Sequence, residues 1–223
     1  MNIVFVAPPA AGKGTQAKLV CDKYHLKHLS TGDLLREVTK KDDEFSKSIK
    51  ERMSKGLLIS DEIILKLITD ELEKSSGSLF DGFPRNLAQA KKFDEMLSKI
   101  NQKIDYIIYL EIDEEVAKQR IVGRMVCPSC NNVYNYDLDQ INIEHTCDCG
   151  SILTKREDDT LETFTKRFEI YETETKPIID YYKDHDNFYT VNSNLKTEEV
   201  FKQIENIIGE KWLVLNQNVK LNF

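Results

Sequence analysis

The sequence predicts an α/β fold in which a parallel β-sheet is wrapped by helices. Short apolar runs of strand character alternate along the chain with longer stretches of helical periodicity, an order typical of parallel sheets. A glycine-containing turn joins the first apolar run to the first helical stretch. The expected strands cover residues 3–7, 79–81, 104–112 and 188–191, and the expected helices cover 15–24, 87–100, 113–124, 161–183 and 197–208.

Two segments interrupt this alternation. The pattern of residues 30–74 predicts helices throughout, with one helix beginning near Thr31 or Asp33 and another at Ser60. Residues 125–157 carry cysteine, asparagine, tyrosine and glycine with short β runs, which indicates a small inserted β domain. A chain of 223 residues can form one α/β domain with such insertions. We assign no structure to the last fourteen residues.

The composition argues against nucleic acid or membrane as a partner. The formal net charge is −7, so no global basic field would attract nucleic acid or an anionic membrane. No run approaches the roughly 20 consecutive apolar residues that a membrane helix needs. The first apolar run leads into a glycine turn instead of a small-residue cleavage site, so we expect a cytoplasmic protein.

Four of the five cysteines are crowded into one short segment, and cytosolic thiols stay reduced. Cys127 and Cys130 form a C-x₂-C knuckle, and Cys147 and Cys149 follow after 16 residues. This spacing favours one structural zinc ion held by four thiolates. Because a C-x-C pair needs a tight turn to bring both side chains to one side, His145 is an alternative to Cys147 as the third ligand.

The segment APPAAGKGT at residues 7–15 has the features of a phosphate-binding loop. Backbone N–H groups at the start of a helix can hold an anion, and Lys13 would add a positive charge. The pattern G-x-x-x-x-G-K-[ST] is not met in full, because Ala7 replaces the first glycine and Gly14 separates Lys13 from the hydroxyl residue.

Two further motifs place charged side chains near the ends of expected elements. STGDLLRE at 30–37 puts Arg36 on the first turns of a helix, from which it could reach a phosphate. LFDGFPRN at 79–86 puts Asp81 at the carboxyl end of a buried strand, where α/β sheets carry functional groups. Asp81 could hold Mg²⁺ there through water.

Four arginines flank the cysteine-rich insertion. Arg120 and Arg124 lie four residues apart on the helix expected to enter it, and Arg156 and Arg167 follow it. Phosphoryl transfer needs cations around the transferred group and exclusion of water more than covalent chemistry. The four arginines therefore fit a phosphoryl-transfer site, although a single surface arginine is usually only a solvated charge.

Together these motifs resemble the adenylate kinases of the nucleoside monophosphate kinase family, over about residues 1–205. The resemblance rests on G-K-G-T, D-G-F-P-R, R-I-V-G-R and R-E-D-D-T-L-E-T-F-T-K-R. It implies a P-loop NTPase-type core with a parallel five-stranded sheet (1–29, 60–124 and 158–223), a helical AMP-binding insertion (30–59) and a zinc-bearing lid (125–157).

This chain departs from the family pattern at two places. The family loop usually reads G-x-P-G-x-G-K-G-T, so Ala7 and Ala10 stand where glycine is usual. If either position needs a positive φ, alanine costs on the order of 1 kcal/mol relative to glycine. Long zinc-carrying lids of the family read C-x₂-C, sixteen residues and C-x₂-[CD], and here the second pair is one residue shorter.

The resemblance also implies the reaction and the residue roles. ATP and AMP would be converted reversibly to two ADP by in-line, Mg²⁺-dependent transfer without a covalent enzyme intermediate, and these small molecules would be the partners of a monomer. The implied catalytic residues are Lys13, Arg85, Arg124, Arg156, Arg167, Asp158 and Asp159. The implied ATP contacts are Ala10, Ala11, Gly12, Lys13, Gly14, Thr15, Arg120, Arg124, Val133, Tyr134 and Leu195. The implied AMP contacts are Thr31, Arg36, Leu57, Leu58, Ile59, Gly82, Phe83, Pro84, Arg85, Gln89, Arg156 and Arg167.

Two other functions are weighed against this one. A related kinase could use GTP as the phosphoryl donor or UMP as the phosphoryl acceptor. The amide of Gln89, however, offers the adenine edge both a hydrogen-bond donor and a hydrogen-bond acceptor, so Gln89 favours AMP, together with Thr31. A non-catalytic zinc-ribbon module that keeps a nucleotide loop is disfavoured by the acidic composition and by Asp81, Arg85 and Arg167.

Overall fold

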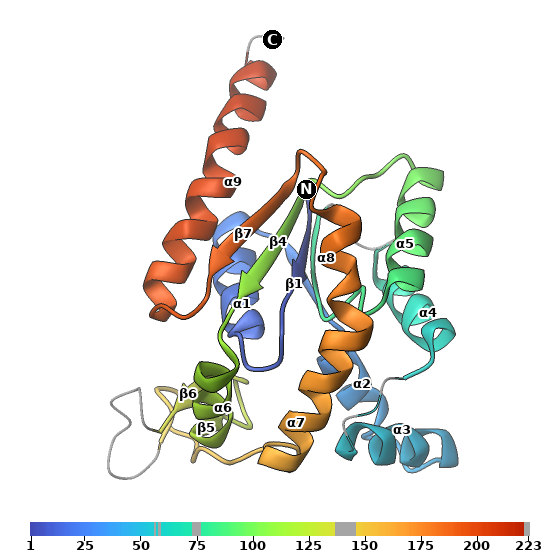
Figure 1. The fold of residues 1–223 in the computed structure, drawn as a ribbon, viewed down its shortest axis with the longest axis vertical. Helices are drawn as coiled ribbons and strands as arrows, with labels where there is room; N and C mark the ends of the chain where they lie inside the picture. The colour runs from blue at the N-terminus through green and yellow to red at the C-terminus, as the bar shows by residue number, and fades with distance from the viewer. Residues whose placement is uncertain (56, 58, 73–76, 137–145, 221–223) are drawn as a thin grey trace.

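The computed structural model describes residues 1–55, 57, 59–72, 77–136 and 146–220, with side chains up to Gly209. A five-stranded parallel sheet forms its centre, in the order β2–β3–β1–β4–β7 (Figure 1). The expected P-loop NTPase-type α/β fold is confirmed. The strands are β1 (Asn2–Val6), β2 (Lys27–Ser30), β3 (Ser78–Asp81), β4 (Tyr106–Glu111) and β7 (Phe188–Asn192).

Helices pack on both faces of this sheet. In Figure 1, α1 and α9 lie on one side of the strands and α5 and α8 on the other. The helices are α1 (Lys13–Tyr24), α2 (Thr31–Val38), α3 (Glu44–Ser54), α4 (Asp61–Leu72), α5 (Leu87–Lys99), α6 (Glu114–Val122), α7 (Leu161–Ile170), α8 (Pro177–Tyr182) and α9 (Thr197–Lys220).

Apolar side chains alternate along the strands, so the sheet has a separate apolar core on each face. Ile3 and Phe5 of β1 belong to the core beneath α1, α6 and α9. Val4 and Val6 belong to the opposite core, which contains buried side chains of α2, α3, α4, α5 and α8. The strand order places β1 between β3 and β4 at the middle of the sheet. In such sheets, ligands bind outside the carboxyl ends of the strands.

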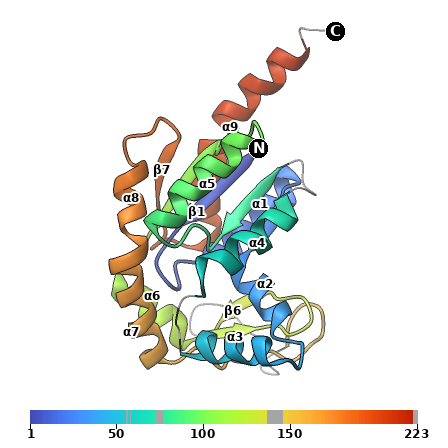
Figure 2. The same cartoon turned by 90° about the vertical axis from the view of Figure 1, so that its right-hand side faces the viewer.

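Described parts of both interrupting segments lie at that end of the sheet (Figures 1 and 2). One contains α2 and α3, and their N-terminal caps explain where they begin: Ser30 Oγ accepts from the Asp33 N–H at 3.2 Å, and Asp43 Oδ1 from the Ser46 N–H at 2.7 Å. The other contains an antiparallel pair, β5 (Arg124–Val126) and β6 (Val133–Asn135).

The helix expected over 161–183 contains one wide turn. Lys176 N–H donates to Tyr171 O at 2.8 Å, a π-type bond within Tyr171–Thr175. Pro177 lacks an N–H and its ring would clash with the carbonyl four residues earlier in a regular helix, so a local widening accommodates it. In this arrangement the Thr175 hydroxyl donates to Arg85 O at 2.7 Å.

The structure differs from the sequence expectations in three elements. The edge strand β2 was not predicted, because K-H-L-S has no apolar run. The helix expected over 113–124 ends at Val122, so Arg124 begins β5 and does not share a helix face with Arg120. The final helix extends past residue 208 to Lys220. Within the described residues, we found no helix with the length and apolar character needed to cross a membrane.

Candidate active site and metal centre

A cavity of about 950 Å³ lies at the carboxyl ends of the strands. Its lining includes the turn after β1, the start of α2, the turn after β3, and residues of β6 and of the segment after β7. Eight lining residues are lysine or arginine and four are aspartate or glutamate, in a chain whose net charge is −7. Positive charge is thus concentrated in one cavity, which suits a ligand with several negative charges.

The cavity brings together most of the expected site residues. All eleven residues expected to contact ATP line it. Thr31, Phe83 and Gln89 are buried, the side chain of Asp159 is 1% exposed, and none of these four lines it; Leu58 lies outside the described residues. The remaining expected residues that line it are Arg36, Leu57, Ile59, Asp81, Gly82, Pro84, Arg85, Arg156, Asp158 and Arg167.

The loop after β1 presents backbone N–H groups to this cavity. Gly12 precedes α1 with a φ of 77°, and no side chain caps the helix. The first-turn N–H groups therefore lack a side-chain acceptor and can bind an anion. Ser193, which follows β7, donates through Oγ to Ala11 O at 2.6 Å and holds the loop in place.

Lys13 and Asp81 form the polar centre of the cavity. Lys13 Nζ lies 3.5 Å from Asp81 Oδ1, and His28 Nε2 lies 3.2 Å from Asp81 Oδ2. Burial lowers the pKa of Lys13, an effect that the Asp81 charge opposes. Burial alone would raise the pKa of Asp81, but Lys13 and His28 outweigh it and hold that pKa below its ordinary value. Asp81 is therefore ionised at neutral pH and available to a hydrated cation.

Ala10 has a φ of 61°, whereas Ala7 and Ala11 have no positive φ. A left-handed conformation costs a residue with an L side chain about 1–2 kcal/mol of stability. The extra freedom of glycine in the unfolded chain costs the folded state about 0.4–1 kcal/mol.

We therefore expect Ala10→Gly to raise the free energy of unfolding by up to about 1 kcal/mol and to keep or tighten ATP binding. Denaturant unfolding and ATP titration measure both. Ala11→Gly is the control and should destabilise; a destabilised Ala10→Gly would contradict the strain argument.

On the other side of the cavity, three backbone contacts hold the Arg85 segment. Arg85 Nε donates to Gly82 O at 2.8 Å, and the Arg85 N–H donates to Gln89 Oε1 at 2.8 Å. Thr175 holds the Arg85 carbonyl, as described above. Gly82 has a φ of 81°, and a Cβ there would lie 2.7 Å from Thr31 Oγ1, so the turn requires glycine. Burial lowers the pKa of Arg85 to about 10, with the nearby Arg167 as a further cause.

Two of the buried residues make contacts within the protein. Thr31 Oγ1 donates to Gly82 O at 2.9 Å. Gln89 Nε2 donates to Asp61 Oδ1 at 2.6 Å, in addition to the bond from Arg85. An amide has two N–H groups and two acceptor lone pairs, so these contacts leave one of each. Arg36 lines the cavity and pairs with Asp33 on the same helix, with Nε to Oδ1 at 3.2 Å.

The arginines that flank the insertion converge on the cavity, but their partners differ. Arg124 Nε donates to Asp159 Oδ2 at 2.6 Å, and Arg167 Nη1 donates to Asp158 Oδ2 at 3.1 Å. Arg156 has no carboxylate within 4.0 Å among the described residues, and burial followed by the Arg124 charge lowers its pKa to about 10. A half-buried arginine without a carboxylate partner indicates that an anionic ligand completes its surroundings.

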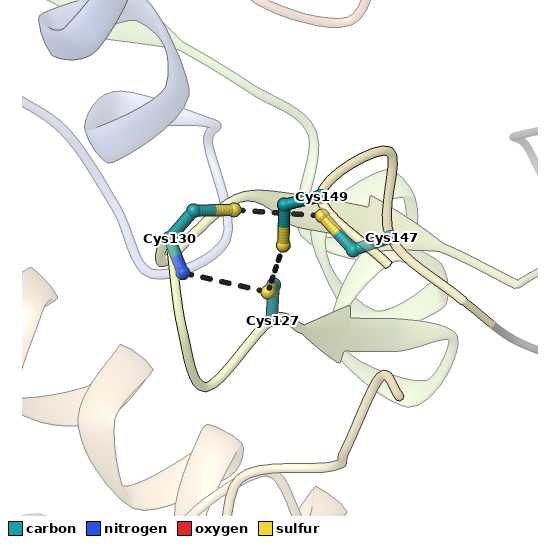
Figure 3. Close-up of side chains that lie close together, drawn as sticks. All are labelled: Cys127, Cys130, Cys147 and Cys149. Carbon is teal, nitrogen blue, oxygen red and sulfur yellow. Dashed lines mark hydrogen bonds between the residues drawn. The ribbon is translucent and has the colours of Figure 1, made fainter. Parts of the chain in front are cut away.

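The four expected cysteines form one cluster beside the turn that joins β5 to β6. Figure 3 shows their sulfur atoms turned toward one another, and all four lie within 4.8 Å of each other. The sulfur atoms of Cys127 and Cys149, and those of Cys130 and Cys147, are 3.4 Å apart. Tetrahedral zinc with bonds of about 2.3 Å separates its sulfur ligands by about 3.8 Å, so the donor set fits zinc.

A tight turn makes the shortened pair possible. Gly150, with a φ of 86°, donates its N–H to Cys147 O at 2.7 Å, and the Cys147 N–H donates to Ser151 O at 2.8 Å. Both side chains of the C-x-C pair therefore reach the same cluster. The alternative ligand His145 lies outside the described residues.

Sequence reasoning missed several residues that position the site. His28 contacts Asp81, Thr175 holds the Arg85 carbonyl, Ser193 holds the phosphate loop and Asp61 accepts from Gln89. Only Ser193 had a local signal, because it lies in the polar run N-S-N directly after an expected strand. The others are ordinary residues whose role depends on distant partners.

Comparison with known proteins identifies the family. A family model described as adenylate kinase matches residues 5–187. The chain belongs to the adenylate kinase family. An adenylate kinase of Archaeoglobus fulgidus is 42% identical over 212 residues, which cover 93% of this chain and 98% of that protein. Adenylate kinases of Thermoanaerobacter sp. (strain X514) and Thermosipho africanus are each 39% identical, over 95% and 93% of this chain and 99% of each relative. As an adenylate kinase, the protein is a phosphotransferase.

Proposed function

We propose that the protein catalyses the reversible transfer of the γ-phosphoryl group of ATP to AMP, giving two ADP, with Mg²⁺ bound to the nucleotide. The observation that carries this proposal is the position of Lys13, Arg85 and Arg156 around one cavity, where the two arginines have no carboxylate partner among the described residues. A phosphoryl group in transfer spreads negative charge over its oxygens, and such cations stabilise it.

In this proposal, ATP and AMP occupy two ends of the cavity. The N–H groups of the phosphate loop hold the ATP phosphates, and Arg120 and Arg124 approach them from the lid side. Arg36 and Arg85 hold the AMP phosphate, while Arg156 and Arg167 lie between the two and contact the group in transfer. The proposed core comprises residues 1–29, 60–124 and 158–223, with the AMP-binding insertion at 30–59 and the lid at 125–157.

The residues of this chain have limited tasks in the reaction. They bind and align the two nucleotides, exclude water and offset the charge of the transferred group, without a covalent intermediate. Asp158 and Asp159 orient the arginines with which they pair. Mg²⁺ would bridge phosphate oxygens and neutralise charge when bound, and the Asp81 carboxylate is the group proposed to hold it through water.

AMP is the proposed acceptor because of Gln89. Its amide keeps one N–H and one lone pair beyond its contacts with Asp61 and Arg85, and the edge of adenine offers the complementary pair. The test is formation of ADP from ATP with AMP, GMP, CMP and UMP as acceptors, repeated with GTP as donor. We expect kcat/KM to be at least about tenfold higher with AMP than with the other acceptors. This is the ratio expected when another base loses the pair of hydrogen bonds to Gln89. A faster reaction with UMP would instead assign a related kinase.

We also propose a monomer that acts in the cytoplasm on small molecules. All the proposed nucleotide contacts except Leu58 lie among the described residues of one chain. The five free thiols are compatible with a reducing compartment. The net charge of −7 favours nucleotides in a local cationic cavity over nucleic acid on a basic surface.

The lid is proposed to bind one structural zinc ion through Cys127, Cys130, Cys147 and Cys149. Zinc would cross-link two turns of the lid at a distance from the reacting phosphates, so it would contribute to folding without joining the chemistry. A ligand that binds only the folded state at 100 times its Kd contributes about 2.7 kcal/mol.

Removal of zinc should therefore lower the Tm by about 5–10 °C, while turnover at low temperature and saturating nucleotide changes little. Elemental analysis and thermal unfolding of wild type, Cys147→Ser and His145→Ala give the test. We expect Cys147→Ser to lose zinc and His145→Ala to keep it; Cys21→Ala, which removes a thiol outside the cluster, is the control. The reverse pattern for Cys147 and His145 would disprove the four-thiolate site.

A further inference from the structure

Tyr134 touches both the cavity and the cysteine cluster. It belongs to β6, lines the cavity and packs against the cluster formed by Cys127, Cys147 and Leu153. Its hydroxyl oxygen lies 3.2 Å from Cys147 Sγ and 3.2 Å from Asp148 Oδ2. One side chain thus joins the proposed metal loop to the proposed donor-nucleotide site.

The single hydroxyl proton has two possible acceptors, and their surroundings distinguish them. Asp148 is exposed, so water can satisfy its carboxylate. Cys147 is only 3% exposed, so its sulfur has little access to water. A zinc-bound cysteine is a thiolate, which can accept a hydrogen bond but has no proton to donate. Four thiolates around Zn²⁺ carry a net charge of −2, which favours a donor directed at the buried sulfur.

The strand that carries Tyr134 is attached to the donor side of the cavity. The next residue, Asn135, donates through Nδ2 to Arg120 O at 3.0 Å. Arg120 in turn donates through Nη2 to Leu195 O at 2.9 Å. Val133 precedes Tyr134 and also lines the cavity. A change in the position of Tyr134 would therefore shift residues expected to contact ATP, whereas Arg36 and Arg85 belong to other elements.

We propose that Tyr134 is a positioning residue that couples the two sites: its hydroxyl donates to the Cys147 thiolate, and the bound metal thereby fixes the wall of the ATP site. This inference rests on the zinc site proposed above. Coupling between two ligands is reciprocal in their equilibrium affinities, so zinc should tighten ATP binding and ATP should tighten zinc binding by the same factor.

Tyr134→Phe removes the hydroxyl and keeps the ring. The Kd for zinc is measured by competition with a chelator, with and without ATP, and the Kd values for ATP and AMP are measured with and without zinc. In wild type, we expect zinc removal to raise the ATP Kd about tenfold and to leave the AMP Kd nearly unchanged. In Tyr134→Phe, the zinc Kd should rise about tenfold, as for other losses of a hydrogen bond to a metal ligand, and the ATP Kd should no longer respond to zinc.

Two further variants make the test specific. Tyr136→Phe makes the same change on a ring that is 57% exposed and should behave as wild type. Asp148→Asn should keep the coupling, and loss of coupling there would overturn the assignment of the proton to Cys147. Equal zinc dependence of the ATP Kd in wild type and Tyr134→Phe would overturn the inference while leaving the metal site intact. A wild type that holds no zinc would overturn both.

Discussion

Lys13→Met is expected to lower turnover by about three orders of magnitude, because it removes the cation that the phosphate loop itself carries into the cavity. Losing a single preorganised donor to a transition-state anion typically costs about 10²–10³-fold. The fold should persist, since Lys13 contributes no apolar surface to either core. The substitution also leaves the Asp81 carboxylate, 8% exposed, with His28 as its remaining partner, so the free energy of unfolding should fall by about 1–3 kcal/mol.

The double variant Lys13→Met/Asp81→Asn separates the catalytic effect from the stability effect. It removes the buried charge together with its partner, so it should recover most of the lost stability without recovering turnover. Lys92→Met, on the exposed face of α5, is the control and should be unchanged in both measurements. Turnover of Lys13→Met within about tenfold of wild type would disprove the assignment of the phosphate loop.

The parts of the site that could be predicted from sequence are those in which spacing alone fixes the geometry. A glycine loop between a strand and a helix directs N–H groups at one point wherever it occurs, so residues 7–15 were interpretable without the structure. Asp81 was placed by the rule that strands of a parallel sheet end at one edge. The C-x₂-C knuckle is likewise a local turn, with the Cys130 N–H 3.4 Å from Cys127 Sγ.

The parts that could not be predicted depend on contacts between distant segments. The bond between Thr175 and Arg85 spans 90 residues and requires the π-type turn before Pro177. The contact of His28 with Asp81 requires β2 to pair with β3, and β2 itself carries no apolar signal. Nor does the sequence reveal that Gln89 is bonded to Asp61, because a buried amide and an exposed one look alike in a helical pattern.

Arg85→Ala is expected to weaken AMP binding about 100-fold while changing ATP binding by less than about threefold. Arg85 has no carboxylate partner within 4.0 Å among the described residues, so its charge is not already neutralised, and hydrogen bonds to charged groups contribute about 1.5–3 kcal/mol each. Arg36→Ala should have the same preference for AMP but a smaller effect, about tenfold. Its guanidinium is 39% exposed and already paired with Asp33.

Binding titrations of each nucleotide against wild type, Arg85→Ala, Arg85→Lys and Arg36→Ala measure this difference. Arg85→Lys keeps the charge but loses the planar fork and the bond from Nε to Gly82 O, so its AMP affinity should lie between wild type and Arg85→Ala. If the turn that contains Gly82 had collapsed in Arg85→Ala, thermal unfolding would detect a loss of stability that Arg85→Lys does not share. An equal loss of affinity for ATP and AMP in a stably folded Arg85→Ala would mean that Arg85 does not belong to the acceptor site. Loss of a residue that contacts only AMP should weaken AMP binding much more than ATP binding.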